Sequence, residues 1–443
     1  KSVEAVMRLR VIIALAAIAC LGLKAQDDWE RKLHEGNQNR QRGLYAEAEK
    51  YYLQALAEAE KFGDRDPRLA KALNNLAALW HEQARYPEAE EAYGRAIEIW
   101  HTTLGPDDTR IATALNNLGE VYRMQGRYAD AEQHYKRALR IREKILADAP
   151  VAVASTLNSL SVVNLHRGEY PDAERQQRRA LSLNESALGP EHLSIAVNLN
   201  NLGELYRVLG RYQEARPAYQ RSLEIKQRLL GEEHPDVATS LNNMGALYQA
   251  EGDLEAAAGL YQKALNIRER VLGPEHPGVA AALNNLASVA RRREQFDAAA
   301  ASLTKAIAIW EKALGADHPN LAGAFNNLAE VHQAAGRQTE AETLYRRSLE
   351  IVEKTLGPTH LETGRVAFNL GTVFLTQEKW SGAEKLFQRA LSVYERHYGA
   401  RHPELGVILR GLAVCYASLG RVTEANGMTA RLALIDQFST SLR

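Results

Sequence analysis

The chain is poor in cysteine, with only Cys20 and Cys415 among its 443 residues. Cys20 lies in a stretch that we predict below to be cleaved off, so the mature protein keeps only Cys415, has no internal disulfide and has to be stabilised by packing. The sequence also lacks the spacings of common catalytic sites: it has no His-Glu-x-x-His, no Gly-x-x-x-x-Gly-Lys-Ser/Thr and no Gly-x-Ser-x-Gly. We therefore expect no enzyme, no bound metal and no other cofactor.

An excess of one charge sign is missing as well, because 55 Lys and Arg residues balance 55 Asp and Glu residues. Domains that bind nucleic acid usually carry a clustered basic surplus, so we expect no nucleic-acid partner. Long hydrophobic runs are confined to the first 25 residues. We therefore expect no membrane span in the mature protein.

The first residues have the pattern of an export signal. Arg8 and Arg10 precede the apolar run 11–23, and Ala25 follows it. A run of 13 residues is too short to span a bilayer comfortably, so residues 1–25 are predicted to be a cleaved signal peptide. Lipoprotein anchoring at Cys20 is the less favoured alternative. The mature protein is expected to be periplasmic or extracellular in a bacterium.

The rest of the chain is built around one stretch, 114–122, which reads Ala-Leu-Asn-Asn-Leu-Gly-Glu-Val-Tyr and recurs every 42 residues. A fixed period of this length indicates a stacked array of repeats rather than one closed core. The first leucine-type position of each copy is Leu73, Leu115, Leu157, Leu199, Leu241, Leu283, Phe325, Ala367 or Leu409.

Each repeat is predicted to hold two helices. In the repeat that contains 114–122, a helical period runs through Leu115, Leu118, Gly119 and Tyr122. A second such period starts at Ala131, after the turn 126–128. Small residues alternate with tyrosines on the facing helices, as expected of close core packing. A glycine ends most second helices, after Leu104, Leu188, Leu230, Leu272, Leu314 or Leu356.

The pattern Leu-x-x-Leu-Gly-x-x-Tyr followed by Ala-x-x-x-Tyr resembles the tetratricopeptide repeat, in the 42-residue form of the kinesin light chain. The resemblance implies an all-α fold: a right-handed superhelical solenoid of antiparallel helix pairs. It also implies that the first helices line a concave groove. We expect a signal peptide at 1–25, a degenerate repeat at 26–68, the array at 69–422 and a capping helix at 423–443.

Asparagine occupies one position of the first helix in seven successive repeats. On a helical wheel this position flanks the core, so it can face a groove. An amide offers both a donor and an acceptor, which suits the backbone of an extended peptide, although a structural ladder of amides is the alternative. This first row is Asn74, Asn116, Asn158, Asn200, Asn242, Asn284 and Asn326.

A second asparagine row follows the first by one residue, and we expect it to be mainly structural. Its members are Asn75, Asn117, Asn201, Asn243, Asn285, Asn327 and Asn369.

Charged residues lie on the same side of the first helix as the first row. Solvated surface pairs are the simpler interpretation, and contact with an acidic ligand is the alternative. They are Glu120, Arg123, Glu204, Arg207, Arg291 and Glu330.

Histidine also recurs at 42 residues, just before the first helix. This position, at the start of a helix, favours a turn or capping role over metal binding. We therefore expect turn or cap residues at His192, His234, His276, His318, His360 and His402.

Taken together, these features predict an exported scaffold that binds an extended peptide or partner segment in its groove. One alternative is a structural array that supports an envelope assembly through its convex face or ends. Another is a subunit without catalytic residues in an enzyme complex.

Overall fold

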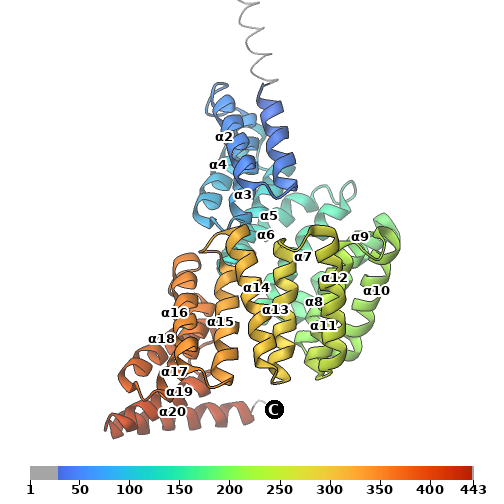
Figure 1. The fold of residues 1–443 in the computed structure, drawn as a ribbon. Coiled ribbons are helices and arrows are strands. Elements are labelled where there is room, and N and C mark those ends of the chain that lie inside the picture. Colours follow the sequence, from blue (N-terminus) through green and yellow to red (C-terminus); the bar gives the residue numbers. More distant parts are fainter. Residues whose placement is uncertain (1–27, 442–443) are drawn as a thin grey trace, which may run out of the picture. The chain divides into compact units, whose positions relative to one another are not determined.

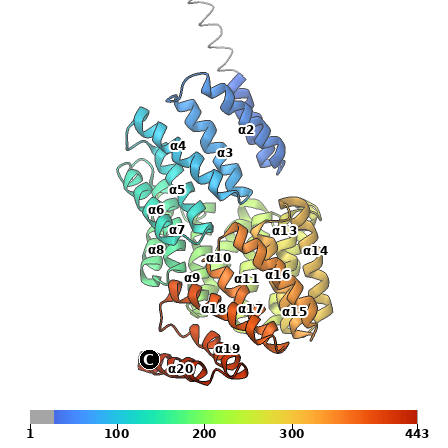
Figure 2. The same ribbon diagram turned by 90° about the vertical axis from the view of Figure 1, so that its left-hand side faces the viewer.

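The computed structural model describes residues 28–441, and every regular element in that part of the chain is helical. The predicted signal peptide, including Cys20, lies outside these residues. The described residues form two compact units, which meet in sequence between Glu169 and Tyr170. We call them the N-terminal unit and the C-terminal unit. Figure 1 and Figure 2 show that each consists of antiparallel helix pairs.

The N-terminal unit begins with a helix at residues 28–41. It continues with α2 (Tyr45–Glu60), α3 (Pro67–Glu82), α4 (Tyr86–Leu104), α5 (Thr109–Met124), α6 (Tyr128–Glu143) and α7 (Pro150–His166). The stretch 26–68, expected to be a degenerate repeat, thus contains the helix at 28–41 and α2.

The C-terminal unit begins with α8, which has the sequence position of a second helix, and six helix pairs follow. Its elements are α8 (Tyr170–Leu188), α9 (Leu193–Val208), α10 (Tyr212–Leu230), α11 (Pro235–Glu251), α12 (Leu254–Leu272), α13 (Pro277–Arg292), α14 (Phe296–Leu314), α15 (Pro319–Ala334), α16 (Gln338–Thr355), α17 (Leu361–Thr376), α18 (Trp380–Tyr398), α19 (Leu405–Ser418) and α20 (Val422–Ser441). The expected all-α solenoid of helix pairs is confirmed.

The two helices of a repeat approach closely because a glycine on one faces an aromatic ring on the other. A Cβ atom at Gly203 of α9 would lie 2.8 Å from Tyr219 of α10, which no real side chain tolerates. Tyr219 is 1% exposed, so the ring fills the space beside the glycine. The same contact joins Gly119 to Tyr135 in the N-terminal unit. The predicted alternation of small and large residues is confirmed.

Helix ends follow the predicted chemistry with one difference. Gly231 caps α10 with a φ of 83°, a left-handed region that glycine adopts without strain. However, α16 ends at Thr355, so Leu356 is its cap residue. Pro403 lies in the turn before α19, which begins at Leu405. No helix in the described part of the chain is long and apolar enough to cross a membrane.

Candidate functional site

The first helices form the candidate binding surface. First helices of neighbouring repeats touch one another, as α9 touches α11 and α13 touches α15, whereas second helices pack mainly against first helices. The asparagines of both rows lie on the first helices, and most are half-buried. We call the surface that they form with the charged residues one turn away the first-helix face.

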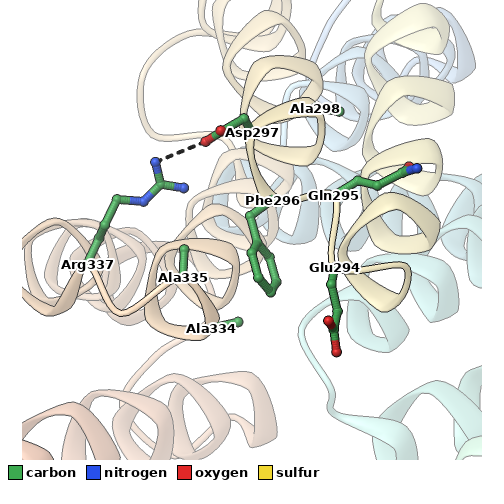
Figure 3. Close-up of a pocket in the computed structure, with 8 residues that line it drawn as sticks. All are labelled: Glu294, Gln295, Phe296, Asp297, Ala298, Ala334, Ala335 and Arg337. Atoms are coloured by element: carbon green, nitrogen blue, oxygen red, sulfur yellow. Dashed lines mark hydrogen bonds and ion pairs between the residues drawn. The ribbon is translucent and has the colours of Figure 1, made fainter.

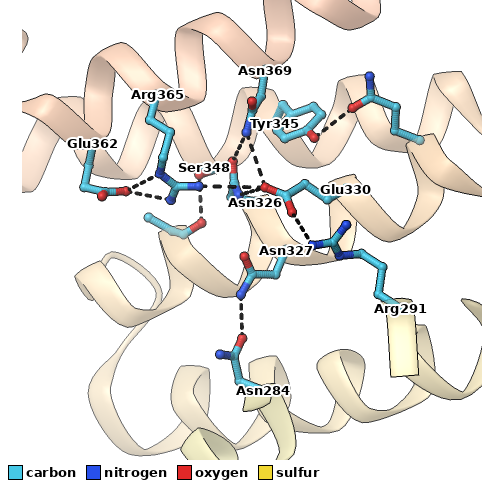
Figure 4. A network of polar contacts seen from close by, with 12 residues as sticks. Asn284, Arg291, Asn326, Asn327, Glu330, Tyr345, Ser348, Glu362, Arg365 and Asn369 are labelled. Atoms are coloured by element: carbon cyan, nitrogen blue, oxygen red, sulfur yellow. Dashed lines mark hydrogen bonds and ion pairs between the residues drawn. The ribbon is translucent and has the colours of Figure 1, made fainter. Parts of the chain in front are cut away.

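In the C-terminal unit the two asparagine rows are joined into a ladder. The second-row amide of each repeat donates to the first-row carbonyl of the repeat before it, 43 residues earlier, and Figure 4 shows the last two steps. The bonds run from Asn243 to Asn200 at 2.7 Å, Asn285 to Asn242 at 2.6 Å, Asn327 to Asn284 at 2.9 Å and Asn369 to Asn326 at 2.9 Å. The ladder supports the structural role expected of the second row.

The ladder also changes what the first row can offer a ligand. The Oδ1 atoms of Asn200, Asn242 and Asn284 already accept a bond, whereas their Nδ2 groups make none within the described residues. At these three residues one lone pair of the acceptor is already used, whereas the donor is free, which differs from the free donor and acceptor expected on each side chain. The row presents donors, which suit carbonyl or carboxylate oxygens.

Asn326 does not belong to the accessible row. Its side chain is fully buried, and its Nδ2 donates to Glu330 Oε1 at 2.9 Å. We had expected it to face the groove, and this is a second correction. Glu330 lies one turn later on the same helix, where its carboxylate accepts this bond.

In the N-terminal unit the first row is bonded differently. Asn116 Nδ2 lies 3.5 Å from the hydroxyl of Ser159, which stands where the second row would supply an asparagine. Asn74 Nδ2 lies 3.4 Å from Asn75 Oδ1. The Oδ1 atoms of Asn74 and Asn116 are buried and accept no hydrogen bond. Asn158 is half-buried and has other interactions.

Two of the charged pairs are held by a tyrosine as well as by each other. Arg123 Nε donates to Glu120 Oε2 at 2.8 Å, and the hydroxyl of Tyr135 donates to the same oxygen at 3.0 Å. Burial by itself would raise the pKa of Glu120, but the Arg123 bond and charge outweigh it and lower that pKa. These pairs are thus more enclosed than the solvated pairs we expected.

The C-terminal unit repeats this arrangement with Glu204, Arg207 and Tyr219, whose hydroxyl donates to Glu204 at 2.9 Å. Sequence reasoning missed the tyrosines, although each follows its glutamate by 15 residues.

Glu330 is the centre of a different network, drawn in Figure 4. Its carboxylate lies 3.5 Å from Arg291 of the preceding repeat and 3.8 Å from Arg365 of the following one. Arg365 also pairs with Glu362 at 2.6 Å. Arg291 is 36% exposed and has this one distant carboxylate, so it is the most accessible of the predicted arginines.

Five of the six recurring histidines are helix caps, and His402 lies in the turn before α19, which agrees with the predicted turn or cap role. In each of five first helices the ring Nδ1 accepts the backbone N–H two residues later, at 3.0–3.2 Å. They are His192, His234, His276, His318 and His360. Burial lowers the pKa of His318 to about 4, which keeps the accepting ring neutral. Within residues 28–441, no three His, Cys, Asp or Glu side chains are grouped so as to hold a metal ion.

One protein-family model matches the chain along nearly its whole described length. A model described as "Tetratricopeptide repeat" matches residues 33–100, 69–144, 152–228, 194–270, 236–312, 279–354, 320–396 and 377–428. No curated protein matches the chain.

Solved structures with a similar arrangement of helices include three repeat proteins. BtubC of P. vanneervenii is 24% identical, and the match covers 51% of this chain and 91% of that one at a TM-score of 0.43. The kinesin light chain repeats of Podosopora anserina are 26% identical over 47% and 99% of the two chains, at 0.40. A Rap protein complexed with Competence and Sporulation Factor is 14% identical over 84% and 98%, at 0.49.

Proposed function

The chain belongs to the tetratricopeptide repeat family, whose arrays are scaffolds for protein interaction, and we propose that its first-helix face binds an extended segment of a partner protein. The proposed role is binding alone. The observation that carries the proposal is the row of free donors on Asn200, Asn242 and Asn284.

The spacing of these donors favours a particular ligand conformation. Neighbouring first helices pack about 8–10 Å apart, so the donors recur at about that interval. A polyproline II segment rises about 3.1 Å per residue with three residues per turn, so every third carbonyl points the same way about 9 Å apart. We propose that the row bonds every third backbone carbonyl of such a segment.

Side chains of the ligand would meet the charged residues of the same face. Arg207 is already bonded to Glu204, so a ligand carboxylate gains little there. Arg291 has only Glu330 at 3.5 Å and is the better candidate for an acidic ligand residue.

A pair of single variants tests the proposal on peptides selected from a display library. Asn242→Asp keeps the oxygen that accepts from Asn285 and removes the free donor. One lost hydrogen bond is worth about 0.5–1.5 kcal/mol, so affinity should fall roughly 2- to 13-fold with the fold intact. The matched control is Asn285→Asp, which breaks the ladder and should lower the melting temperature instead. Selected peptides that bind Asn242→Asp as tightly as the unaltered protein would sink the proposal.

We also propose that the protein is exported after cleavage near Ala25. The support is the pattern of Arg8 and Arg10 before the apolar run 11–23. N-terminal sequencing of protein isolated from its native cells should find a mature chain that begins near Gln26. Met7 retained on a cytosolic product would rule export out.

A further inference from the structure

A second polar linkage recurs between repeats, away from the first-helix face. Arg211, the cap residue before α10, reaches back to Glu174 of the preceding second helix at 2.8 Å. Its guanidinium lies 4.5 Å from the ring centre of Tyr206, whose hydroxyl donates to the same glutamate. Three side chains are thus joined: an arginine, an aromatic residue five positions earlier and a glutamate 37 positions earlier.

The linkage is present in both units. Arg421 bonds Glu384 at 2.8 Å above the ring of Tyr416, and Arg127 bonds Glu90 at 3.0 Å above the ring of Tyr122. Lys379 takes the arginine's place beside Glu342 at 2.7 Å. Because the glutamate is always the fifth residue of a second helix, its position is fixed by the fold.

At Arg337 the linkage has lost two of its three members. The fifth residue of α14 is Ala300 instead of glutamate, and His332 replaces the aromatic residue. Among residues 28–441, the only acceptor that Arg337 reaches is Asp297 at 3.2 Å, whose side chain is 96% exposed. Arg337 Nε and Nη2 and His332 Nδ1 are buried with no hydrogen-bond partner.

An open pocket of about 580 Å³ adjoins this arginine. Figure 3 shows the ring of Phe296 in the middle of it, facing Ala334 and Ala335, with Arg337 on one side. The walls therefore combine an apolar surface with one guanidinium group. Glu294 and Asp297 line the same pocket and leave its charge unfavourable to a multiply charged anion.

We propose that this pocket binds a carboxylate carried on an apolar group, which gives Arg337 the acceptor that a glutamate at position 300 would otherwise supply. The guanidinium fork suits a carboxylate. Its Nε and Nη2 groups have no acceptor but are enclosed, so the Arg337 side chain, which is 34% exposed, has to turn them toward the pocket when the ligand binds. The apolar part of the ligand lies against Phe296 and the two alanines. Glu294 and Asp297 repel phosphate more strongly than a group with a single charge.

The test uses the full mature chain and calorimetric titration with two acids, phenylacetate and N-acetyl-glycyl-phenylalanine. Each acid should bind saturably and at least tenfold more tightly than its neutral amide. Binding of phenylacetate assigns the pocket to small acids, and binding of the peptide acid alone assigns it to a chain's terminal carboxylate. Failure of both acids to exceed their amides overturns the proposal.

Three variants check that the binding is at this site. Ala300→Glu supplies the missing carboxylate from within, so it should abolish acid binding and raise the melting temperature. Ala308→Glu places the same charge at an exposed position of α14, about two turns further along the helix, and should leave acid binding unchanged. Arg337→Gln should abolish binding without raising the melting temperature. Acid binding that survives both Ala300→Glu and Arg337→Gln would contradict the assignment.

Discussion

The first-row asparagines of the two units use different side-chain atoms to bond the protein. In the C-terminal unit Oδ1 accepts from the next repeat, as in Asn200, and Nδ2 stays free. In the N-terminal unit Nδ2 of Asn116 faces Ser159, and Oδ1 is buried without a donor. The residue 43 positions later does not decide this alone, because Asn117 follows Asn74 at that spacing and the Oδ1 of Asn74 still has no donor. An identical motif therefore does not imply an identical surface.

The units also differ in how their first helices are capped. Asp66 and Asp108 cap α3 and α5 in the N-terminal unit, whereas histidines cap the corresponding helices of the C-terminal unit. An aspartate accepts the cap bond as an anion and a histidine as a neutral ring. The two units should therefore respond differently to acid.

The largest expected effect is one in which the two units behave alike. Tyr135→Ala and Tyr219→Ala each empty a fully buried site beside a glycine, and each should lower the free energy of unfolding by about 3–5 kcal/mol. Urea denaturation followed by circular dichroism measures both. The control is Tyr219→Phe, which loses only the bond to Glu204. A large cost in one unit alone would mean that the cores differ too.

Acid should separate the two units. The folded pKa of His318, about 4, lies below its ordinary value of 6.5, so its contribution is present above about pH 6.5 and is lost as the pH falls toward 4. The bond to Arg68 lowers the pKa of Asp66 below 3.8, so that cap persists until the pH falls below that value. The loss at His318 is about 2 kcal/mol after allowance for its partial exposure.

Hydrogen exchange at pH 4.5 and pH 7 checks this difference. The first turn of α15 should lose protection at the lower pH, while that of α3 should keep it. His318→Asn, which caps without titrating in this range, should remove the effect. Equal loss of protection in α3 and α15 would contradict the cap assignment.

Ser159→Asn should bring the N-terminal unit closer to the C-terminal one. An asparagine there can donate to Asn116 Oδ1 as Asn243 donates to Asn200, which should stabilise the protein by about 0.5–1.5 kcal/mol. Thermal unfolding measures the gain. Ser159→Ala is the control and should not stabilise. No gain from the asparagine would show that the missing ladder bond is not what distinguishes the units.

The smallest expected effect concerns the turn between the helices of a repeat. Glu294 has a φ of 60° where Gly210 stands in another repeat with 68°. Glu294→Gly should stabilise the protein by about 0.5–1 kcal/mol by removing this strain, and Gly210→Ala should destabilise it by a similar amount. Thermal unfolding of both variants decides the point, since a loss of stability in Glu294→Gly would rule out strain there.

The sequence predicted the fold and its repeats because both depend on short-range periodicity. The packing of Gly203 against Tyr219 and the cap role of His318 followed from spacing within one repeat. The ladder was only the alternative for the first row, since its bonds depend on which residue of the next repeat comes within bonding distance of Asn200. The burial of Asn326 was not predicted, although Glu330, which accepts its amide, lies only four residues later.

The pocket at Arg337 could not be predicted from a search for motifs because it arises from missing residues. Neither Ala300 nor His332 stands out by itself. Their significance is seen only by comparison with Glu174 and Tyr206, which occupy the equivalent positions in another repeat. The 37-residue spacing of arginine and glutamate is visible in the sequence, but only the structure shows that it is a contact.

The most direct test of the central claim compares the first asparagine row of the C-terminal unit with that of the N-terminal unit. It uses calorimetric titration with one library-selected peptide. The double variant Asn200→Asp and Asn242→Asp removes two free donors, so affinity should fall by about 1–3 kcal/mol. The matched double variant Asn74→Asp and Asn116→Asp alters the row whose donors already face protein atoms, and it should bind within about twofold of the unaltered chain, because no ligand bond is lost. Equal losses, or a loss only in the second variant, would contradict the assignment of peptide binding to the donor row of the C-terminal unit.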